Sequence, residues 1–358
     1  MQDPEAPVID ADGHVLMEAA EGWLDYFERV DAERMESLIV DNRRHWQQRE
    51  GVDKEAIYDA IRQRNKGEGG WDPKARLAVM DAEGIDVAVL FGTELGLNQE
   101  AYSPSVCRGY NRWLADYCAG DPARLKGVAL LPLDDIDAAR AELQRAVADD
   151  GFVGFFMKAS VRGWSCDAER FHPLYDTAEA LGVPLLVHIP HGVKALLEEN
   201  FGYNFLRTHV VHSFAGMLAC MDAIYGGLLD RFPRLRVAFL ESQVGWLPWF
   251  VDRLDEQHAT YSVRPGLETG LRRVPSAYLD EGRLFFSCDP DERYLAMAAG
   301  AQLAPGVAGE DCILWASDYP HSDAIYPGAL RALTERDDLS EAQKRKLTRD
   351  NARRLYGF

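Results

Sequence analysis

Short apolar runs alternate with longer amphipathic stretches along almost the whole chain. The apolar runs lie at residues 7–14, 87–91, 127–131, 152–157, 184–188, 236–241, 284–287 and 313–318. Runs without a polar face are typical of parallel strands that helices cover on both sides. Helical periodicity is found at residues 73–83, 105–118, 136–148, 173–181, 205–229, 247–261, 291–301 and 340–355.

Eight strands that alternate with helices predict an α/β fold, and specifically a (β/α)8 barrel. The alternative is a doubly wound open sheet, which carries a GxGxxG turn after an early strand in its nucleotide-binding forms. No such motif follows the early strands of this chain. We therefore predict one barrel domain over residues 1–358, because barrels of this kind reach that length as single units.

One region interrupts the alternation. Residues 31–70 are rich in charged and polar side chains and end in a glycine cluster at Gly67, Gly69 and Gly70. This stretch is too long for an ordinary loop between a strand and a helix. We expect a helical insertion or lid after the first strand.

Composition and charge narrow the possible functions. The 358 residues are 47% hydrophobic and carry a formal net charge of -19, which argues against nucleic acid or an anionic membrane as a partner. No apolar run reaches the ~20 residues that span a bilayer, and the N-terminus lacks a signal-peptide pattern. We expect a cytoplasmic protein whose six scattered cysteines are core residues and form neither disulfides nor a zinc site.

The first strand contains the earliest candidate site residues. Asp10, Asp12 and His14 occupy alternate positions, so their side chains point to the same face of a strand. Carboxylate and imidazole groups are common metal ligands. A polar strand end that faces water would show the same pattern. The residues at the ends of the other predicted strands are needed to distinguish the two interpretations.

Ionisable residues also stand at the ends of four other predicted strands. They are Lys158, His188, Glu241 and Asp318, with His191 and His321 three residues beyond His188 and Asp318. The C-terminal strand ends of a (β/α)8 barrel meet at one face, where active sites are built. We expect these side chains to converge with Asp12 and His14 on a metal site.

Several of these residues have an alternative role. His188 could be a core histidine bonded to the backbone, although its place after an apolar strand favours a metal ligand. Lys158 could bind a substrate carboxylate, become carbamylated as a bridging ligand, or pair with an acidic residue. His212 lies in the long helical stretch after strand five and could either reach the site or pack elsewhere.

Aromatic side chains near the predicted strand ends indicate an apolar substrate pocket. They are Trp164, Tyr203, Phe205, Trp246, Trp249, Tyr319 and Tyr326, and several could equally be ordinary core residues. We assign Lys158, His191, Trp246 and Tyr319 to substrate binding. The expected partner is a small molecule.

Taken together, these motifs resemble a known family. Asp12-Gly13-His14, His188, residues 229–233 (LDRFP), 245–248 (GWLP) and 317–321 (SDYPH) are similar to the amidohydrolase-related family of metal-dependent barrels. This family includes the aminocarboxymuconate-semialdehyde decarboxylases and the resorcylate decarboxylases. The resemblance runs from strand one through strand eight. It implies that Asp12, His14 and His188 are metal ligands, that Asp318 is a ligand or a base, and that a homodimer is reasonable.

Two positions depart from the family pattern. The usual strand-one pair is His-x-His, whereas Asp12 stands first here, and Glu241 replaces the strand-six histidine that serves the decarboxylases as acid and base. A glutamate beside a divalent cation tends to become a ligand, because the cation lowers its pKa. With Glu241, His212 and His321 added, the donors exceed the need of one cation and fit two.

This donor set leads us to expect a dinuclear iron monooxygenase that uses O2 to hydroxylate a small organic substrate, similar to a small hydroxylase branch of the family. Iron with manganese, zinc, or manganese alone are alternative metals. The expected catalytic groups are Glu241, Asp318 and His321. The alternative is a metal-dependent hydrolase or non-oxidative decarboxylase of a small carboxylated substrate, in which Asp318 or Glu241 moves the proton. A third possibility, a non-enzymatic binding barrel, predicts a protein without stoichiometric metal.

Overall fold

The computed structural model describes residues 6–37, 40, 67–92, 103–161, 163–188, 205–264, 270–321 and 323–358. Most of the predicted insertion at 31–70 lies outside these ranges, as does His191. Residues 29–37, at its beginning, are helical.

Eight parallel strands form one sheet in which each strand pairs with the next in sequence. They are β1 (Ile9–Val15), β2 (Val87–Gly92), β3 (Leu125–Ala129), β4 (Gly154–Met157), β7 (Leu185–Val187), β8 (Val237–Phe239), β9 (Leu284–Cys288) and β12 (Ile313–Trp315). The sheet closes because the His14 N–H donates to the Tyr319 carbonyl at 2.7 Å and the Asp318 N–H donates to the Asp12 carbonyl at 3.0 Å. The predicted (β/α)8 barrel is confirmed.

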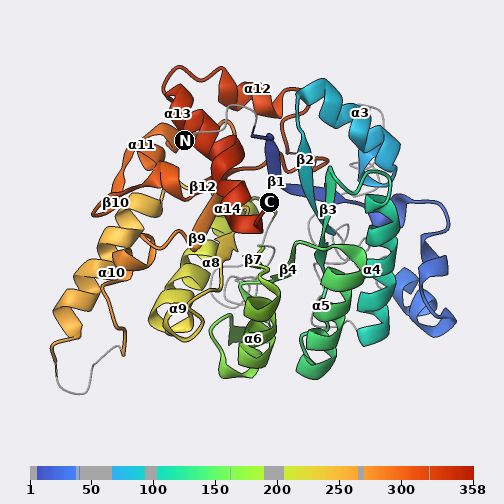
Figure 1. Ribbon diagram of the computed structural model, residues 1–358, viewed down its shortest axis with the longest axis horizontal. Helices are drawn as coiled ribbons and strands as arrows, with labels where there is room; N and C mark the ends of the chain where they lie inside the picture. Colours follow the sequence, from blue (N-terminus) through green and yellow to red (C-terminus); the bar gives the residue numbers. More distant parts are fainter. Residues whose placement is uncertain are drawn as a thin grey trace.

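Helices surround the strands (Figure 1). They are α3 (Pro73–Glu83), α4 (Pro104–Cys118), α5 (Ile136–Asp150), α6 (His172–Leu181), α8 (Phe205–Tyr225), α9 (Leu228–Arg231), α10 (Leu247–Tyr261), α11 (Leu295–Gly300), α12 (Ala329–Thr334), α13 (Glu341–Arg345) and α14 (Asn351–Tyr356). The side chains of Asp72, Ser103 and Asp135 accept a backbone N–H at the start of α3, α4 and α5, as helix N-caps commonly do. Two small hairpins, β5–β6 (Ser160–Val161, Trp164–Ser165) and β10–β11 (Gln302–Ala304, Val307–Ala308), complete the sheet structure.

Two predicted strands end earlier than the apolar pattern indicates. β8 ends at Phe239 and β12 at Trp315, so Glu241 and Asp318 lie in the loops that follow. Both residues have a left-handed backbone, with φ of 51° and 54°. A left-handed residue turns the chain out of the extended path, which explains why strand pairing stops before it. The long helix predicted at 205–229 is likewise divided into α8 and α9 at Gly227, where φ is 73°.

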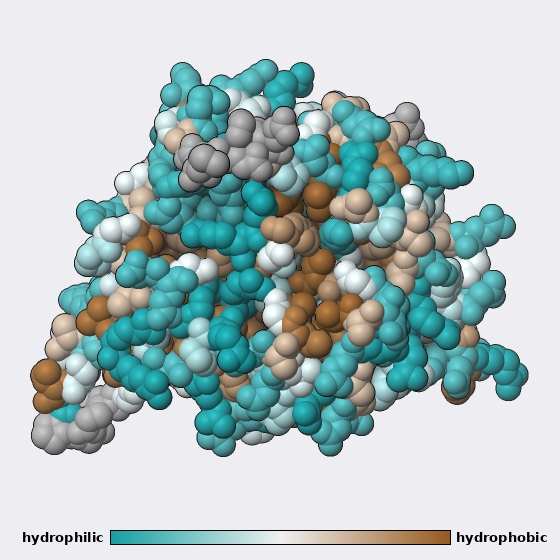
Figure 2. Space-filling model, in the orientation of Figure 1, coloured by the Kyte–Doolittle hydropathy of each residue, from teal (hydrophilic) through white to brown (hydrophobic). Residues whose placement is uncertain are grey.

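The interior of the barrel is apolar apart from the residues at one end of the strands. Strand residues such as Leu186, Phe239 and Leu314 are fully buried, and all six cysteines are buried and free. Hydrophilic residues cover most of the face shown in Figure 2, with hydrophobic ones gathered near its middle. In the part of the chain described, no helix is long and apolar enough to cross a membrane.

Candidate metal centre

The first strand delivers two of its three polar side chains to a common cluster. Asp12 and His14 are buried on β1, and their closest approach is 3.5 Å, between Asp12 Oδ1 and His14 Nε2. Asp10 has a different partner: its Oδ1 accepts the Ser317 backbone N–H at 2.8 Å and its Oδ2 accepts the Ser317 hydroxyl at 2.5 Å. Strand pairing to β2 is irregular between Asp10 and Gly13. Asp10 stands at the beginning of this irregularity and, unlike Asp12 and His14, does not join the cluster.

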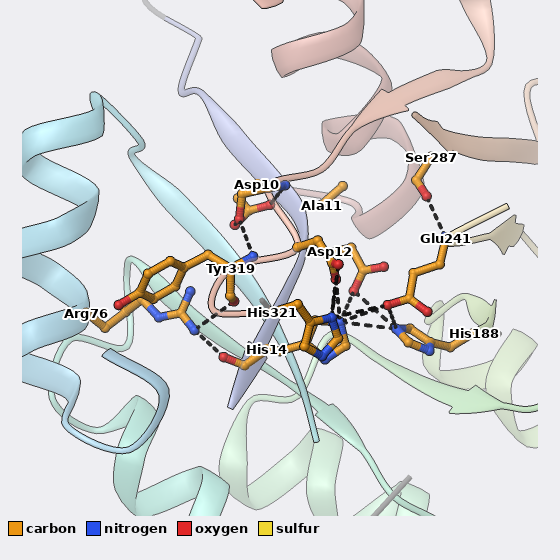
Figure 3. Close-up of polar contacts among 12 residues, drawn as sticks. Asp10, Ala11, Asp12, His14, Arg76, His188, Glu241, Ser287, Tyr319 and His321 are labelled. Atoms are coloured by element: carbon orange, nitrogen blue, oxygen red, sulfur yellow. Dashed lines mark hydrogen bonds and ion pairs between the residues drawn. The ribbon is translucent and has the colours of Figure 1, made fainter. Parts of the chain in front are cut away.

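His14 lies at the centre of the cluster. Its Nε2 atom is 3.0 Å from Asp318 Oδ1, 3.4 Å from Glu241 Oε1 and 3.4 Å from His188 Nε2. His188 Nε2 also lies 3.5 Å from Asp12 Oδ1. Side chains from four different strand ends therefore point toward one another, as Figure 3 shows for those it labels.

His321 extends the cluster on one side. Its ring stacks on that of His14 with centroids 3.9 Å apart, and its Nδ1 lies 2.9 Å from Asp318 and 3.6 Å from Glu241 Oε1. Two groups of donor atoms result, each within 4.8 Å: Asp12, His14 and His188 in one, and His14, Glu241, Asp318 and His321 in the other. The two groups share His14.

The donor set fits a divalent cation. Asp12 is only 1% exposed, and within the described part of the chain neither of its carboxylate oxygens accepts a hydrogen bond. An ionised carboxylate buried in this way is costly unless a cation compensates it. Mixed carboxylate and imidazole donors suit manganese, iron or zinc.

Burial dominates the electrostatics of three of these residues. It raises the pKa of Asp12 to about 7 and raises the pKa of Glu241 well above its usual range. It also lowers the pKa of the His188 imidazole to about 4, so that ring is neutral at pH 7 and able to act as a ligand.

Asp318 and His321 behave as a charged pair. Burial opposes the ionisation of both, but the neighbouring His321 and His14 hold the pKa of Asp318 well below its usual range. The charge of Asp318, again against burial, raises the pKa of His321 to about 10. One carboxylate of the cluster is therefore ionised beside an imidazolium, while Glu241, 3.6 Å from the same imidazole, favours its neutral form.

Comparison with known proteins identifies the family. A family model described as amidohydrolase matches residues 9–358, nearly the whole chain. The chain belongs to the amidohydrolase family. The relationship that its motifs indicated is confirmed.

Several relatives of this amidohydrolase have been characterised. A gamma-resorcylate decarboxylase from Rhizobium radiobacter is 29% identical over 309 residues, which cover 78% of this chain and 86% of the relative. The crystal structure of a 2,6-dihydroxybenzoate decarboxylase in complex with 2,6-dihydroxybenzoate superposes with a TM-score of 0.60 and 26% identity, covering 79% of this chain and 87% of that one. A manganese-bound 5-carboxyvanillate decarboxylase from Novosphingobium aromaticivorans has the same fold, with a TM-score of 0.73 and 22% identity over 99% and 98% of the two chains. These relatives are decarboxylases, so membership in the predicted iron-hydroxylase branch is not supported.

A buried arginine that the sequence-based prediction did not single out lies next to the first strand of this amidohydrolase. Arg76 of α3 donates to the backbone carbonyls of His14, Gly69 and Tyr319, and its guanidinium lies 4.6 Å from the centre of the Tyr319 ring. The approach is close enough that a Cβ atom on Gly13 would come within 3.3 Å of the guanidinium. Arg76 thus ties β1 to the loop after β12, next to Tyr319 and on the side of β1 away from the donor atoms (Figure 3).

Tyr319 and Trp246, two of the residues predicted to bind substrate, have well-defined contacts with other parts of the protein. The Tyr319 ring packs between Arg76 and Tyr326, on the side of β1 away from the cluster. Trp246 packs edge-on against Phe286 and donates its indole N–H to the Ser242 carbonyl at 2.8 Å. These contacts do not test the predicted role of either residue in substrate binding, which stays a prediction.

Two further predicted residues stay outside the donor groups. Lys158 is buried directly after β4, in keeping with its predicted place at a strand end. His212 is half-buried on α8 and belongs to neither donor group found among the described residues. Their roles in substrate and metal binding stay predictions.

The seventh strand of the barrel, β9, and the residue after it supply polar side chains that the sequence-based prediction missed. Ser287, near the end of β9, accepts the Glu241 backbone N–H at 2.9 Å, and Asp289 follows directly after the strand. Burial and the charge of Asp318 raise the pKa of Asp289 to about 6. The same inspection of strand ends that identified His188 and Asp318 would have found both residues.

Proposed function

We propose that this amidohydrolase is a metal-dependent, non-oxidative decarboxylase of small aromatic carboxylates. The observation that carries the proposal is the convergence of Asp12, His14, His188 and Asp318 at the carboxyl ends of four strands. The relatives add the reaction class, since they act on hydroxylated benzoates such as 2,6-dihydroxybenzoate and 5-carboxyvanillate.

Asp12, His14, His188 and Asp318 would hold the cation. Asp12 offers a buried carboxylate that accepts no hydrogen bond within the described residues, and His188 offers an imidazole whose pKa burial lowers to about 4. A bound divalent cation, most simply manganese as in the 5-carboxyvanillate enzyme, would orient the substrate carboxylate and stabilise negative charge on the ring.

The reaction replaces the carboxylate of the ring by hydrogen. The bond between the ring carbon and the carboxylate breaks, CO2 leaves, and the electron pair stays on the ring carbon, which takes up a proton. Glu241 is suited to deliver that proton, because it lies at the edge of the donor cluster, 3.4 Å from His14 Nε2, and burial raises the pKa of its carboxyl group above the usual range. Solvent would then return a proton to Glu241. His321 would keep Asp318 ionised and oriented through the contact at 2.9 Å.

The proposal can be tested with metal-free protein under anaerobic conditions. The protein is stripped with a chelator, reloaded with Mn2+, and offered 2,6-dihydroxybenzoate and 5-carboxyvanillate while CO2 release is followed. We expect turnover that depends on the metal and not on oxygen. Asp12→Asn should lose it, whereas Asp137→Asn, a substitution at an exposed carboxylate on α5, should keep wild-type rates. Stoichiometric metal without decarboxylation of any ortho-hydroxylated benzoate would refute the proposed reaction.

A second candidate rests on the presence of two donor groups in one site. Six residues supply donors, and Glu241 stands where the family decarboxylases place a histidine. A second cation would make Glu241 and His321 ligands as well, and a dinuclear iron site would support O2-dependent hydroxylation of a C–H bond. Elemental analysis separates the candidates: one ion per chain favours the decarboxylase, while two irons and O2 consumption by the ferrous protein favour the oxygenase.

A further inference from the structure

The loop after β8 has an unusual backbone for residues other than glycine. Glu241 and Gln243 have φ of 51° and 58°, so two residues of a four-residue turn are left-handed. Side chains disfavour this conformation, and neighbouring contacts have to maintain it. The conformation decides where the Glu241 carboxylate points, which is toward His14 (Figure 3).

Strand β9 supplies the contact at the beginning of this loop. The Ser287 hydroxyl oxygen accepts the Glu241 backbone N–H at 2.9 Å, and Ser287 is buried. The bond joins the backbone of Glu241 to the neighbouring strand just where its own strand has ended. It therefore fixes the residue from which the carboxylate projects.

The turn after β9 supplies the contact at the end of the loop. Glu292 is 8% exposed, and its carboxylate bridges two loops: Oε2 accepts the Val244 N–H at 3.0 Å and Oε1 accepts the Asp289 N–H at 3.2 Å. A buried carboxylate that binds two backbone amides is a rigid connection, because both amides would otherwise lack a partner.

The middle of the loop is connected to the same turn. The Gln243 side-chain amide donates to Asp289 Oδ2 at 3.3 Å. Both ends and the middle of residues 241–244 are therefore bonded to one strand and its following turn. No residue of β9 belongs to the two donor groups found among the described residues, so Ser287 acts on the site through Glu241.

From these contacts we infer that Ser287 and Glu292 are positioning residues that hold the Glu241 carboxylate at the metal centre. Ser287 sets the direction of the side chain, and Glu292 fixes the far end of the loop. The inference rests on the proposed function, in which Glu241 serves as proton donor or ligand. Partners that orient the groups of a metal site in this way commonly contribute 10- to 100-fold to metal affinity or activity.

A set of five proteins tests the inference: wild type, Ser287→Ala, Glu241→Gln, the double variant, and Ser242→Ala as control. Ser242 is buried in the same loop but does not bind the Glu241 N–H. Among the described residues, its hydroxyl contacts the Gln243 carbonyl alone, at 3.5 Å. The dissociation constant for Mn2+ is measured by equilibrium dialysis, and kcat and KM are measured at saturating Mn2+.

We expect Ser287→Ala to change the same quantity as Glu241→Gln, either the Mn2+ dissociation constant or kcat, by roughly tenfold. The double variant should show no larger change in this quantity than Glu241→Gln does, because Ser287 can no longer position a carboxylate that has been removed. Ser287→Thr, which keeps the hydroxyl oxygen, should return the dissociation constant or kcat to that of wild type. Ser242→Ala should stay within about twofold of wild type in both quantities. Glu292→Gln, which keeps only one acceptor, should give a smaller change of the same kind.

Two results would overturn the inference. One is a Ser287→Ala protein with wild-type metal affinity and kcat, and the other is a double variant whose losses multiply in full. Failure of the proposed function looks different, since wild type itself would then bind no Mn2+ or release no CO2. The midpoint of thermal unfolding of the metal-free variants shows whether any loss comes from general destabilisation.

Discussion

Asp10 and Ser317 are joined by two hydrogen bonds, one from the serine backbone N–H and one from its hydroxyl, each to a different carboxylate oxygen. This pairing links the lower part of β1 to the residue before Asp318. Since Asp318 also donates its own N–H to the Asp12 carbonyl, the two candidate ligands Asp12 and Asp318 are fixed relative to each other by backbone and side-chain bonds together.

Replacing Asp10 should therefore weaken metal binding without removing a ligand. Asp10→Asn keeps one acceptor oxygen but loses the other, so the Ser317 contact is weakened and Asp318 is less well oriented. We expect about a 10-fold rise in the Mn2+ dissociation constant, measured by equilibrium dialysis. The matched control is Asp86→Asn: that carboxylate accepts the Val8 backbone N–H just before β1 begins, without contacting Ser317, and its replacement should leave metal affinity unchanged. Equal losses in both variants would mean that strand stability, and not ligand orientation, is responsible.

The sequence predicts the barrel and the first ring of donor residues because both depend on local patterns. Apolar runs identify the strands, and a histidine or carboxylate at the end of such a run is conspicuous, as His188 and Asp318 are. The residues that hold these donors in place are harder to recognise from the sequence. Arg76 looks like any charged residue of an amphipathic helix, and only the folded chain brings its guanidinium to the His14 carbonyl. Ser287 and Glu292 act on a loop more than 40 residues away in sequence, a relationship that no local pattern contains.

The same limit explains the substrate-binding predictions. Aromatic residues near strand ends are candidates for a pocket, but the direction of a side chain depends on backbone dihedral angles that the apolar pattern does not contain. Trp246 packs against Phe286 and Tyr319 against Arg76 in this structure, contacts that the apolar pattern does not indicate. Glu241 shows the opposite case, since its left-handed backbone brings a loop residue to the donor cluster.

Arg76 should be among the residues most important for stability. Arg76→Met would remove the guanidinium donor from the buried carbonyl groups of His14 and Gly69, of which Gly69 keeps the Tyr117 hydroxyl, and would remove the positive charge that faces Asp10. We expect a loss of about 3–5 kcal/mol in the free energy of unfolding, measured with urea on metal-free protein. Arg76→Lys should recover only part of it, because an ammonium group lacks the planar fork that reaches several carbonyls.

A suitable control for Arg76 is an arginine on the molecular surface. Arg140 is 41% exposed and pairs with the exposed Asp137, so Arg140→Met should cost less than about 1 kcal/mol. A similarly small effect of Arg76→Met would show that the buried guanidinium contributes little net stability and that its contacts merely compensate its burial.

Metal removal should destabilise the folded protein. A cation that binds only the folded chain at 100 times its dissociation constant adds about 2.7 kcal/mol to the free energy of unfolding. We expect chelation to lower the unfolding midpoint and Mn2+ to restore it in wild type. Asp12→Asn should unfold at a midpoint that is nearly independent of Mn2+. If that variant responds to the metal as wild type does, the stabilising site lies elsewhere on this acidic protein.

Glu292 should give the protein a measurable dependence of stability on pH. Burial raises its pKa in the folded state to about 7, above the ordinary value of 4.5 that applies to the unfolded chain. Between these values the folded chain binds the proton more tightly, so this residue favours folding at low pH, and its contribution is lost as pH rises from about 4.5 to 7. At 1.36 kcal/mol per pKa unit the effect is at most about 3 kcal/mol. Glu292→Gln cannot titrate, so the difference in unfolding free energy between wild type and this variant should change across that window and be flat above about pH 8. Urea unfolding at several pH values measures this difference in unfolding free energy. A difference that is constant from pH 4.5 to 8 would show that the Glu292 carboxylate is ionised in the folded protein throughout this range. The amides of Val244 and Asp289 would then be what stabilises its charge.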